Sequence, residues 1–309
     1  MNNMSVEKAW EMYQIAVLSS SKKRSQVIEE GRWRHHISPK LGERSIDSLT
    51  SFDLLMLRRD LEKRGLSPQT VRHCLSLLHR ILRKAAEWEK YDKQLPNFKG
   101  VMPKFDNRRQ RFLNVEEIGI LLDALKATEK SLNWHDIVLF AVNTGLRRGE
   151  IFSLRLCDIN FNFRIVAVMD TKSGRNRTVR LNDVALAVAL KKAALINERE
   201  NSFQEKAPKV FSRAVKNSGL NNGITDRRHK IVFHTLRHTF ASWLVQDGFP
   251  IALVSQMLGH SSINVTMRYS HLAPSQERQA VDAISHQLER YWKMENNACK
   301  AEVDANKWK

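Results

Sequence analysis

Residues 234–272 read HTLRHTFASWLVQDGFPIALVSQMLGHSSINVTMRYSHL, and this stretch decides the fold of the second half of the chain. Its apolar side chains recur at helical spacing in three segments, 235–246, 251–258 and 263–269. This spacing predicts three consecutive helices. Basic and nucleophilic residues fall near the ends of these segments. The stretch therefore predicts a helical scaffold that carries reactive groups at its ends.

Upstream of this stretch, the pattern adds a small β-sheet to further helices. The expected elements in chain order are a helix capped by Asn114 and Glu117, a buried helix over 132–143, strands over 164–169 and 178–181 joined by the turn 172–177, and a helix over 184–199. Helical and strand periods thus occur together in this part of the sequence. We predict one mixed α/β domain over residues 112–273.

The first 95 residues read as helices joined by short turns. Gly65 is expected to stop one helix, and Ser67 to cap the next, with Pro68 in its first turn. Apolar residues in that next helix are spaced four, three, four and three apart, which buries one face: Val71, Leu75, Leu78, Leu82 and Ala85. We predict an all-α bundle over 1–95.

The remaining segments connect or follow these domains. Residues 96–111 contain two prolines, a glycine and a basic run without any period, so they are expected to form a linker. Residues 274–309 are expected to form a C-terminal helix or tail. This segment has an apolar face formed by Val281, Ile284, Leu288 and Trp292. The face would dock on a neighbouring protomer or fold back on its own domain. The expected fold is mainly α with a small β-sheet.

Composition points to a polyanionic partner. The 309 residues include 51 Lys and Arg against 33 Asp and Glu, a net charge of +18, and basic side chains that neutralise phosphates release condensed counterions. The three cysteines lie far apart without Cys/His ligand spacing, so neither a disulfide framework nor a zinc site is expected. The N-terminus has no signal-peptide pattern and the longest apolar run is too short for a bilayer. A cytoplasmic protein is expected.

Four short segments concentrate the groups that could carry chemistry. They are TGLRRGEI with Arg147 and Glu150, HTLRH with Arg237, LGH ending at His260, and TMRYSH with Tyr269. Each alone is a weak signal, because an arginine after a glycine turn is usually a surface residue and a tyrosine in a helix usually packs. The four occur in one order within one predicted domain, which gives them weight together.

In this order, the segments closely resemble the signature of the tyrosine recombinases, the integrase family of DNA breaking-and-rejoining enzymes. The resemblance covers residues 112–273 and includes the hairpin lysine in DTKSGRNRTVRL. The helical first part looks like the family's core-binding domain, notably over PKLGERSIDSLTSFDLLMLRRDLEKRGLSPQTVRHCLSLLHRIL. The resemblance implies a helical core-binding domain followed by a tyrosine-recombinase catalytic domain.

The resemblance also implies roles for individual residues. Arg147 and Arg237 would clamp a DNA phosphate, with His260 as a further donor. His234 would accept the proton of the nucleophile Tyr269. The remaining matched or neighbouring positions are the general acid Lys172, the supporting Glu150, and candidate DNA contacts at Arg72, Arg80, Arg83, Arg175 and Arg177.

These residue types suit phosphoryl transfer, because its transition state gathers charge on the phosphate oxygens and catalysis is mostly positioning and charge clamping. A guanidinium binds two oxygens at once and keeps its proton. A 3′-phosphotyrosine ester keeps the energy of the broken bond, so ATP is not required for rejoining. With arginines supplying positive charge, no metal or other cofactor is expected.

The resemblance implies a site-specific recombinase on double-stranded DNA, acting as a homotetramer on two sites to integrate or excise a phage or genomic island. A Xer-like resolvase, a type IB topoisomerase and an inactive DNA-binding regulator remain alternatives. DNA-bending or directionality proteins are possible partners, and no membrane partner is expected. Because the first helix is expected close to residue 6, we expect no separate arm-binding domain.

Overall fold

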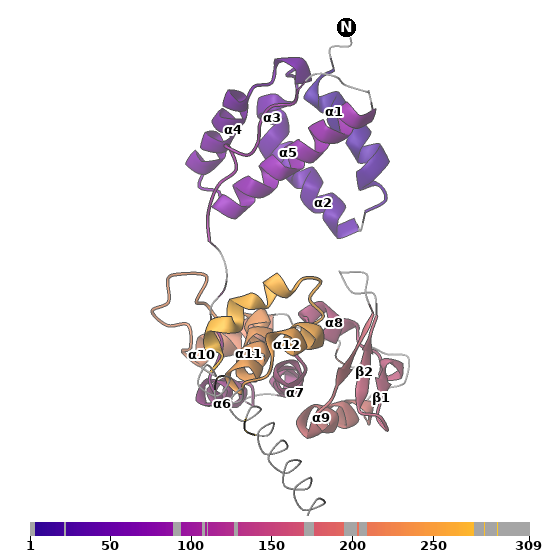
Figure 1. Cartoon of the computed structure of the whole chain (residues 1–309), viewed down its shortest axis with the longest axis vertical. Helices are drawn as coiled ribbons and strands as arrows, with labels where there is room; N and C mark the ends of the chain where they lie inside the picture. Colours follow the sequence, from indigo (N-terminus) through magenta and orange to yellow (C-terminus); the bar gives the residue numbers. More distant parts are fainter. Residues whose placement is uncertain are drawn as a thin grey trace, which may run out of the picture. The chain divides into compact units, whose positions relative to one another are not determined.

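The computed structural model divides the chain into two compact units, Met1–Asn107 and Arg108–Lys309, each with its own core (Figure 1). The division falls inside the stretch that we expected to be a linker. The structure describes residues 4–274 together with 281 and 289, leaving out 22, 89–93, 107–108, 110, 127–128, 170–175, 195–202 and 204–208.

The first unit is helical throughout its described residues. Its elements are α1 (Val6–Tyr13), η1 (Gln14–Leu18), α2 (Lys23–Arg32), η2 (Trp33–Ile37), α3 (Ser38–Leu41), η3 (Ile46–Ser48), α4 (Ser51–Lys63) and α5 (Pro68–Trp88). Helix α5 contacts α1, α4 and η2. It buries the five apolar residues that the spacing selected, from Val71 to Ala85. The predicted cap is also confirmed, since the Thr70 N–H donates to Ser67 Oγ over 3.2 Å.

The segment after α5 belongs in part to the first core. Phe98 and Val101 are buried there, and Arg58 Nη1 donates to the Val101 carbonyl over 3.1 Å. The Asn97 N–H donates to Ser51 Oγ over 3.1 Å. Residues 97–101 are therefore fixed on the first unit, whereas we expected an unpacked linker from residue 96. The missed signal is the apolar pair Phe98 and Val101 among turn residues.

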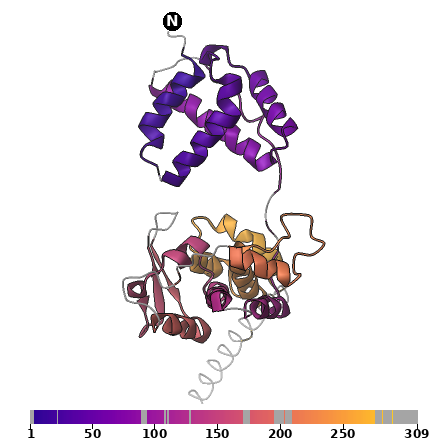
Figure 2. The same cartoon turned by 180° about the vertical axis from the view of Figure 1, so that it is seen from behind.

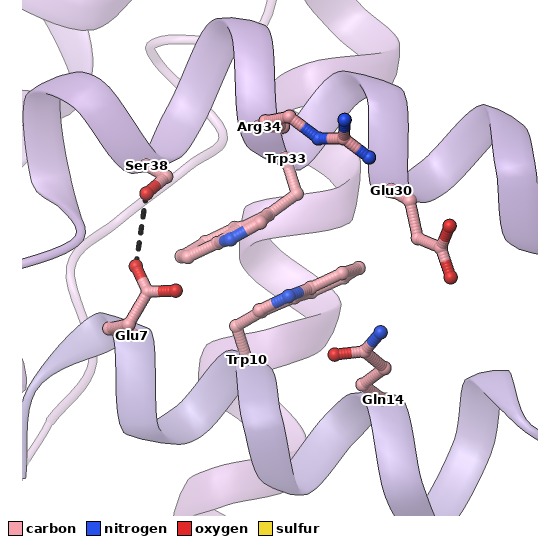
Figure 3. Close-up of a pocket in the computed structure, with 7 residues that line it drawn as sticks. All are labelled: Glu7, Trp10, Gln14, Glu30, Trp33, Arg34 and Ser38. Carbon is pink, nitrogen blue, oxygen red and sulfur yellow. Dashed lines mark hydrogen bonds between the residues drawn. The ribbon is translucent and has the colours of Figure 1, made fainter.

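The indole rings of Trp10 and Trp33 stack in the first unit with centroids 4.9 Å apart and planes 10° from parallel. They help to line a pocket of about 340 Å³ (Figure 3), together with Glu7, Gln14, Glu30, Arg34 and Ser38. Beside the rings, Ser38 Oγ donates to Glu7 Oε2 over 3.0 Å. This contact joins α3 to α1.

The second unit combines helices with one small sheet, as predicted. Its elements are α6 (Val115–Ala124), α7 (Glu129–Thr144), α8 (Arg148–Ser153), η4 (Leu156–Asp158), β1 (Ile159–Asn160), β2 (Ile165–Val168), β3 (Arg177–Arg180), α9 (Asp183–Ala193), α10 (Lys209–Asn217), α11 (Phe233–Gln246), α12 (Ile251–Leu258), η5 (Ile263–Val265) and η6 (Met267–Leu272). Helix α7 packs against α9 and α11. Its buried side chains form the middle of the core, among them Trp134, Ile137 and Phe140.

The sheet is antiparallel in the order β1-β2-β3. Val166 on the central strand pairs with Ile159 on one side and Val179 on the other. The alternation of residues predicted β2 and β3, whereas the two-residue β1 was not expected. Figures 1 and 2 show the sheet beside the helical part of the unit from opposite sides. None of the described helices has the length and apolar character needed to cross a membrane.

Three helical predictions differ from the structure or extend beyond the described residues. Residues 263–269 were expected to form one helix, but two 3-10 segments, 263–265 and 267–272, occupy this stretch. Between them, the Thr266 N–H donates to the Ile263 carbonyl over 2.7 Å. Helix α10 was not expected. The predicted C-terminal helix or tail over 274–309 lies outside the described residues except at Pro274 and at Val281 and Glu289, which are both helical.

Candidate active site

Arg237 on α11 joins the ends of two other helices. Its side chain is buried, with the residue 3% exposed. Nη1 donates to the Gly145 carbonyl over 2.7 Å, and Nη2 donates to the Leu258 carbonyl over 2.5 Å. These carbonyls lie at the C-terminal ends of α7 and α12, where backbone oxygens lack helical partners and the helix dipole is negative. One guanidinium therefore binds both ends and is held in place by them.

Both helix ends turn through glycines with positive φ, Gly145 at 63° and Gly259 at 64°. A Cβ at Gly145 would lie 2.4 Å from Phe240 Cδ1, and a Cβ at Gly259 would lie 2.6 Å from Arg177 Cδ. Glycine is thus required for the backbone conformation and for the close approach of neighbours. These two turns bring the segments before Arg147 and His260 to Arg237.

Glu150 on α8 is shared by two arginines. Arg147 Nη1 donates to Oε1 over 2.8 Å, and the Arg147 backbone N–H donates to Oε2 over 2.8 Å. Arg177 binds both oxygens, through Nη1 over 3.0 Å and Nη2 over 2.8 Å. Although burial opposes ionisation, hydrogen bonds from Arg177 and Arg147 lower the pKa of Glu150 to about 2. The Glu150 carboxylate therefore stays charged and orients Arg147 through these hydrogen bonds.

This arrangement changes the expectation for Arg177. We expected it among the residues that contact the DNA backbone, but its side chain is only 12% exposed and its two Nη atoms bind Glu150. The Arg147 side chain is 31% exposed. Arg147 can therefore present part of its guanidinium to a ligand, whereas Arg177 supports the carboxylate. Glu150 binds both arginines, and its supporting role in catalysis stays a prediction.

Tyr269 on η6 is buried, with 6% of its surface exposed. Its ring belongs to a small apolar cluster formed by residues of α11 and α12: Ala241, Val245, Val254 and Leu258. Its hydroxyl lies 2.5 Å from Nδ1 of His238, also buried on α11. Burial raises the pKa of Tyr269 to about 12, against the opposing charges of Arg268 and Arg237. The resting nucleophile is thus protonated.

The same environment keeps three histidines uncharged. Burial, followed by the charges of His234 and Arg268, lowers the pKa of His238 to about 3. Desolvation and then the charges of Arg237 and Arg147 lower the pKa values of His234 and His260 to about 4. The Tyr269 hydroxyl therefore donates its hydrogen bond to a neutral His238.

The two other histidines occupy different surroundings. His260 Nδ1 lies 2.7 Å from Oγ1 of the buried Thr266, which fixes the imidazole. His234 is exposed on α11. Its ring contacts that of His238 edge-on, with centroids 4.9 Å apart and planes at 85°. The histidine that touches the Tyr269 hydroxyl is His238, whereas the resemblance pointed to His234 as the proton acceptor.

Acidification should destabilise the second unit because His238 is neutral when folded. Its folded pKa is about 3 and its ordinary value 6.5, so the unfolded chain binds more protons between these values and stability falls as pH falls. Between pH 7 and pH 5, His238 alone should cost about 2 kcal/mol. Urea unfolding at the two pH values measures this loss. His238→Asn should show a correspondingly shallower dependence, and equal slopes in both proteins would contradict the assignment.

The structure brings together most of the site residues selected from the sequence. Arg147 precedes α8, which carries Glu150, and α11 carries His234 and Arg237. His260 follows α12, and Tyr269 lies on η6. Lys172 and Arg175 lie outside the described residues. The three candidate DNA contacts of the first unit are exposed on α5, namely Arg72, Arg80 and Arg83. Arg72 lies over the Phe105 ring, and Arg80 forms an ion pair with Glu29.

His238 was not assigned to the site from the sequence, and Arg177 was assigned only as a candidate DNA contact. The signal for His238 was its position four residues after His234, which places both on one helix face. The signal for Arg177 was its position at the start of β3, next to the predicted hairpin.

Among the residues that the structure describes, no group of three or more His, Cys, Asp or Glu side chains could hold a metal ion.

Several known proteins are similar to this chain. The integrase of Salmonella phage P22 is 34% identical over 222 residues, which cover 65% of this chain and 53% of that protein. The tyrosine recombinase XerC of Alcanivorax borkumensis is 26% identical over 288 residues, 88% of this chain and 92% of its own length. This chain thus spans about half the length of the phage protein and most of the length of XerC.

Two solved structures share the fold. The Tn1549 transposon integrase in complex with a circular intermediate DNA aligns with a TM-score of 0.72 at 18% identity, over 92% of this chain and 99% of that chain. A lambda integrase dimer bound to a COC′ core site aligns with a TM-score of 0.68 at 17% identity, over 86% and 95%. The sequence model of the phage integrase family matches residues 111–276, more than half of the chain. The chain therefore belongs to the phage integrase family, the tyrosine recombinases, which are DNA strand-transferring enzymes.

Proposed function

We propose that the chain is a site-specific recombinase that cleaves and rejoins DNA through a 3′-phosphotyrosine intermediate. The observation that carries the proposal is the arrangement around Arg237. This arginine anchors the turns that carry Arg147 and His260, and its charge acts on the Tyr269 hydroxyl. A nucleophile beside two arginines and a histidine matches the needs of phosphodiester attack.

In the proposed cleavage step, Arg147 and Arg237 bind the non-bridging oxygens of the scissile phosphate. His260 adds a donor to the same oxygens. Tyr269 Oη attacks phosphorus in line with the 5′ oxygen, which leaves with the downstream strand. The energy of the broken bond is kept in the tyrosyl ester, so a 5′-hydroxyl from another strand can reverse the step.

Two proton transfers accompany this exchange. We propose that Lys172, on the hairpin outside the described residues, protonates the departing 5′ oxygen. Tyr269 must lose its proton, and the resemblance assigns its acceptor to His234. General acid and base groups at such positions typically contribute 10²–10⁴ in rate.

We propose that the first unit grips DNA through the exposed arginines of α5, Arg72, Arg80 and Arg83. Their side chains lie off the buried face of the helix, where they can reach phosphates. Together with the net charge of +18, they suit a protein that binds around a duplex. Because its proposed substrate is DNA, we propose that the protein acts in the cytoplasm.

Covalent trapping tests the proposal without knowledge of the target site. The protein is mixed with randomly nicked DNA from its source, so that a short leaving strand diffuses away and rejoining fails. The expected product is a detergent-resistant adduct blocked at the 3′ end of the DNA, with the modified peptide containing Tyr269. Attachment through a 5′ phosphate, through another residue, or no adduct at all would refute the proposal.

The same adducts address the biological role. The similarity to the phage P22 integrase favours integration or excision, which joins two unlike sites. We propose that four copies act on two duplexes. A lambda integrase tetramer bound to a Holliday junction shares this fold, with a TM-score of 0.69 at 17% identity. The alignment over 92% of XerC keeps resolution of identical sites as a second candidate. Sequencing the trapped ends should return two unlike core sites for an integrase and one repeated site for a resolvase.

A further inference from the structure

The side chain in direct contact with the Tyr269 hydroxyl is His238, one position after Arg237. Its Nδ1 lies 2.5 Å from Oη, and both residues are buried. The rings are tilted by 54° with centroids 5.8 Å apart, so the contact is made at the ring edge, where the nitrogen lone pair lies. A tyrosine hydroxyl that meets a neutral imidazole in this way donates its hydrogen bond.

His238 also lies between the nucleophile and the surface of the second unit. It follows His234 by one helical turn, and the exposed His234 ring stands edge-on against it. Besides the neutral His234, the groups that act electrostatically on His238 include the cations Arg268, Arg237 and Arg109. An arginine cannot take a proton from Tyr269, and the His234 ring contacts the His238 ring, whereas His238 Nδ1 is already hydrogen-bonded to the Tyr269 hydroxyl.

We propose that His238 is a catalytic residue that holds the Tyr269 hydroxyl in the resting protein and takes its proton during attack. This inference rests on the proposed function and names the proton acceptor within it. As the Oη–H bond breaks, the proton moves to His238 Nδ1 and the oxygen forms its bond to phosphorus. The P–O5′ bond breaks, and the 5′ oxygen keeps that electron pair and takes a proton from Lys172.

The reverse step restores every group. The incoming 5′-hydroxyl gives its proton to Lys172 and attacks phosphorus, the P–Oη bond breaks, and Tyr269 recovers the proton from His238. Burial, and then the surrounding cations, disfavour a charged His238. A bound phosphate brings negative charge that offsets them, so the transfer becomes favourable only when DNA is in place. The resting nucleophile is thereby kept protonated.

Substitution of His238 by asparagine separates two roles, holding the Tyr269 hydroxyl and taking its proton. In His238→Asn, the amide oxygen can replace Nδ1 as a hydrogen-bond acceptor, but it cannot take a proton at neutral pH. We expect DNA binding within about twofold of wild type and single-turnover cleavage slower by on the order of 10²–10⁴. His234→Asn tests the other candidate acceptor on the same helix face and should slow cleavage less than His238→Asn does. His229→Asn is the control, because that side chain is 45% exposed outside the site, and it should cleave as wild type does.

A modified substrate identifies which proton transfer is affected. When sulfur replaces the bridging 5′ oxygen, the leaving thiolate needs no proton, so a defect in the general acid is rescued and a defect in the acceptor is not. His238→Asn should remain slow on this DNA. Rescue of His238→Asn, or a loss confined to His234→Asn, would overturn the proposal. Failure of wild type to form any adduct would instead refute the proposed function.

A second measurement does not depend on how His238→Asn folds. Nitrogen NMR of histidine-labelled wild type should show His238 neutral with Nδ1 as a hydrogen-bond acceptor. Tyr269→Phe should shift that Nδ1 signal and leave the His260 signal unchanged. If the His238 signal did not respond to Tyr269→Phe, the contact would be absent in solution and the proposal would be wrong.

Discussion

Tyr269→Phe should bind DNA as wild type does and form no covalent adduct. The change removes one oxygen, while the phenyl ring keeps its packing between α11 and α12. Loss of a catalytic nucleophile costs on the order of 10⁶ in rate, which places cleavage below detection. Stability should fall by about 1–3 kcal/mol, because Nδ1 of the buried His238 loses its hydrogen-bond partner.

Tyr13→Phe provides the matched control for this experiment. Tyr13 is also buried, and its hydroxyl also has one hydrogen-bond partner, Glu29 Oε2 at 3.3 Å, but it lies in the core of the first unit. Its adduct formation should match wild type on the same nicked DNA. An adduct that persists in Tyr269→Phe, or is lost equally in Tyr13→Phe, would contradict Tyr269 as the nucleophile.

Local sequence signals predicted the elements that have clear caps and periods. Helix α12 has the predicted bounds, and α6 begins with the predicted capping box at Asn114 and Glu117. Helix α8 was missed, because six residues are too few to show a helical period. The predicted helix over 263–269 is replaced by two 3-10 segments, and the buried Thr266 between them is bound to His260, a contact that helical periodicity does not predict.

The sequence predicted individual residues of the site but not the contacts between them. The resemblance selected Arg147, Arg237, His260 and Tyr269, and the structure places them around one buried guanidinium. It could not select partners distant in the chain. Arg177 reaches Glu150 across 27 positions and His238 reaches Tyr269 across 31. Such pairs depend on how the helices and strands pack, which periodicity does not encode.

Arg237→Lys should lose almost as much cleavage as Arg237→Ala. The Gly145 and Leu258 carbonyls are bound by different Nη atoms, at 2.7 and 2.5 Å, and one ammonium cannot reproduce that fork. Either change should slow cleavage by on the order of 10²–10³, as for loss of one transition-state donor. Each carbonyl left without a partner should also cost about 1–3 kcal/mol of stability, measured by thermal unfolding. Arg148→Ala is the matched control, because that side chain is exposed over the Phe152 ring.

The charge of the phosphate separates the clamping role of Arg237 from its structural role. A methylphosphonate at the scissile position carries no negative charge on its oxygens, so the attack no longer needs a cation to neutralise them. On this DNA, the difference between wild type and Arg237→Ala should shrink to about tenfold or less, because one donor's contribution to charge stabilisation is no longer required. A purely structural defect would slow both substrates equally, since misplaced helix ends disturb Tyr269 whatever the charge. Equal losses on the two substrates would therefore assign Arg237 to holding α7 and α12, and a selective loss on the charged phosphate assigns it to the transition state.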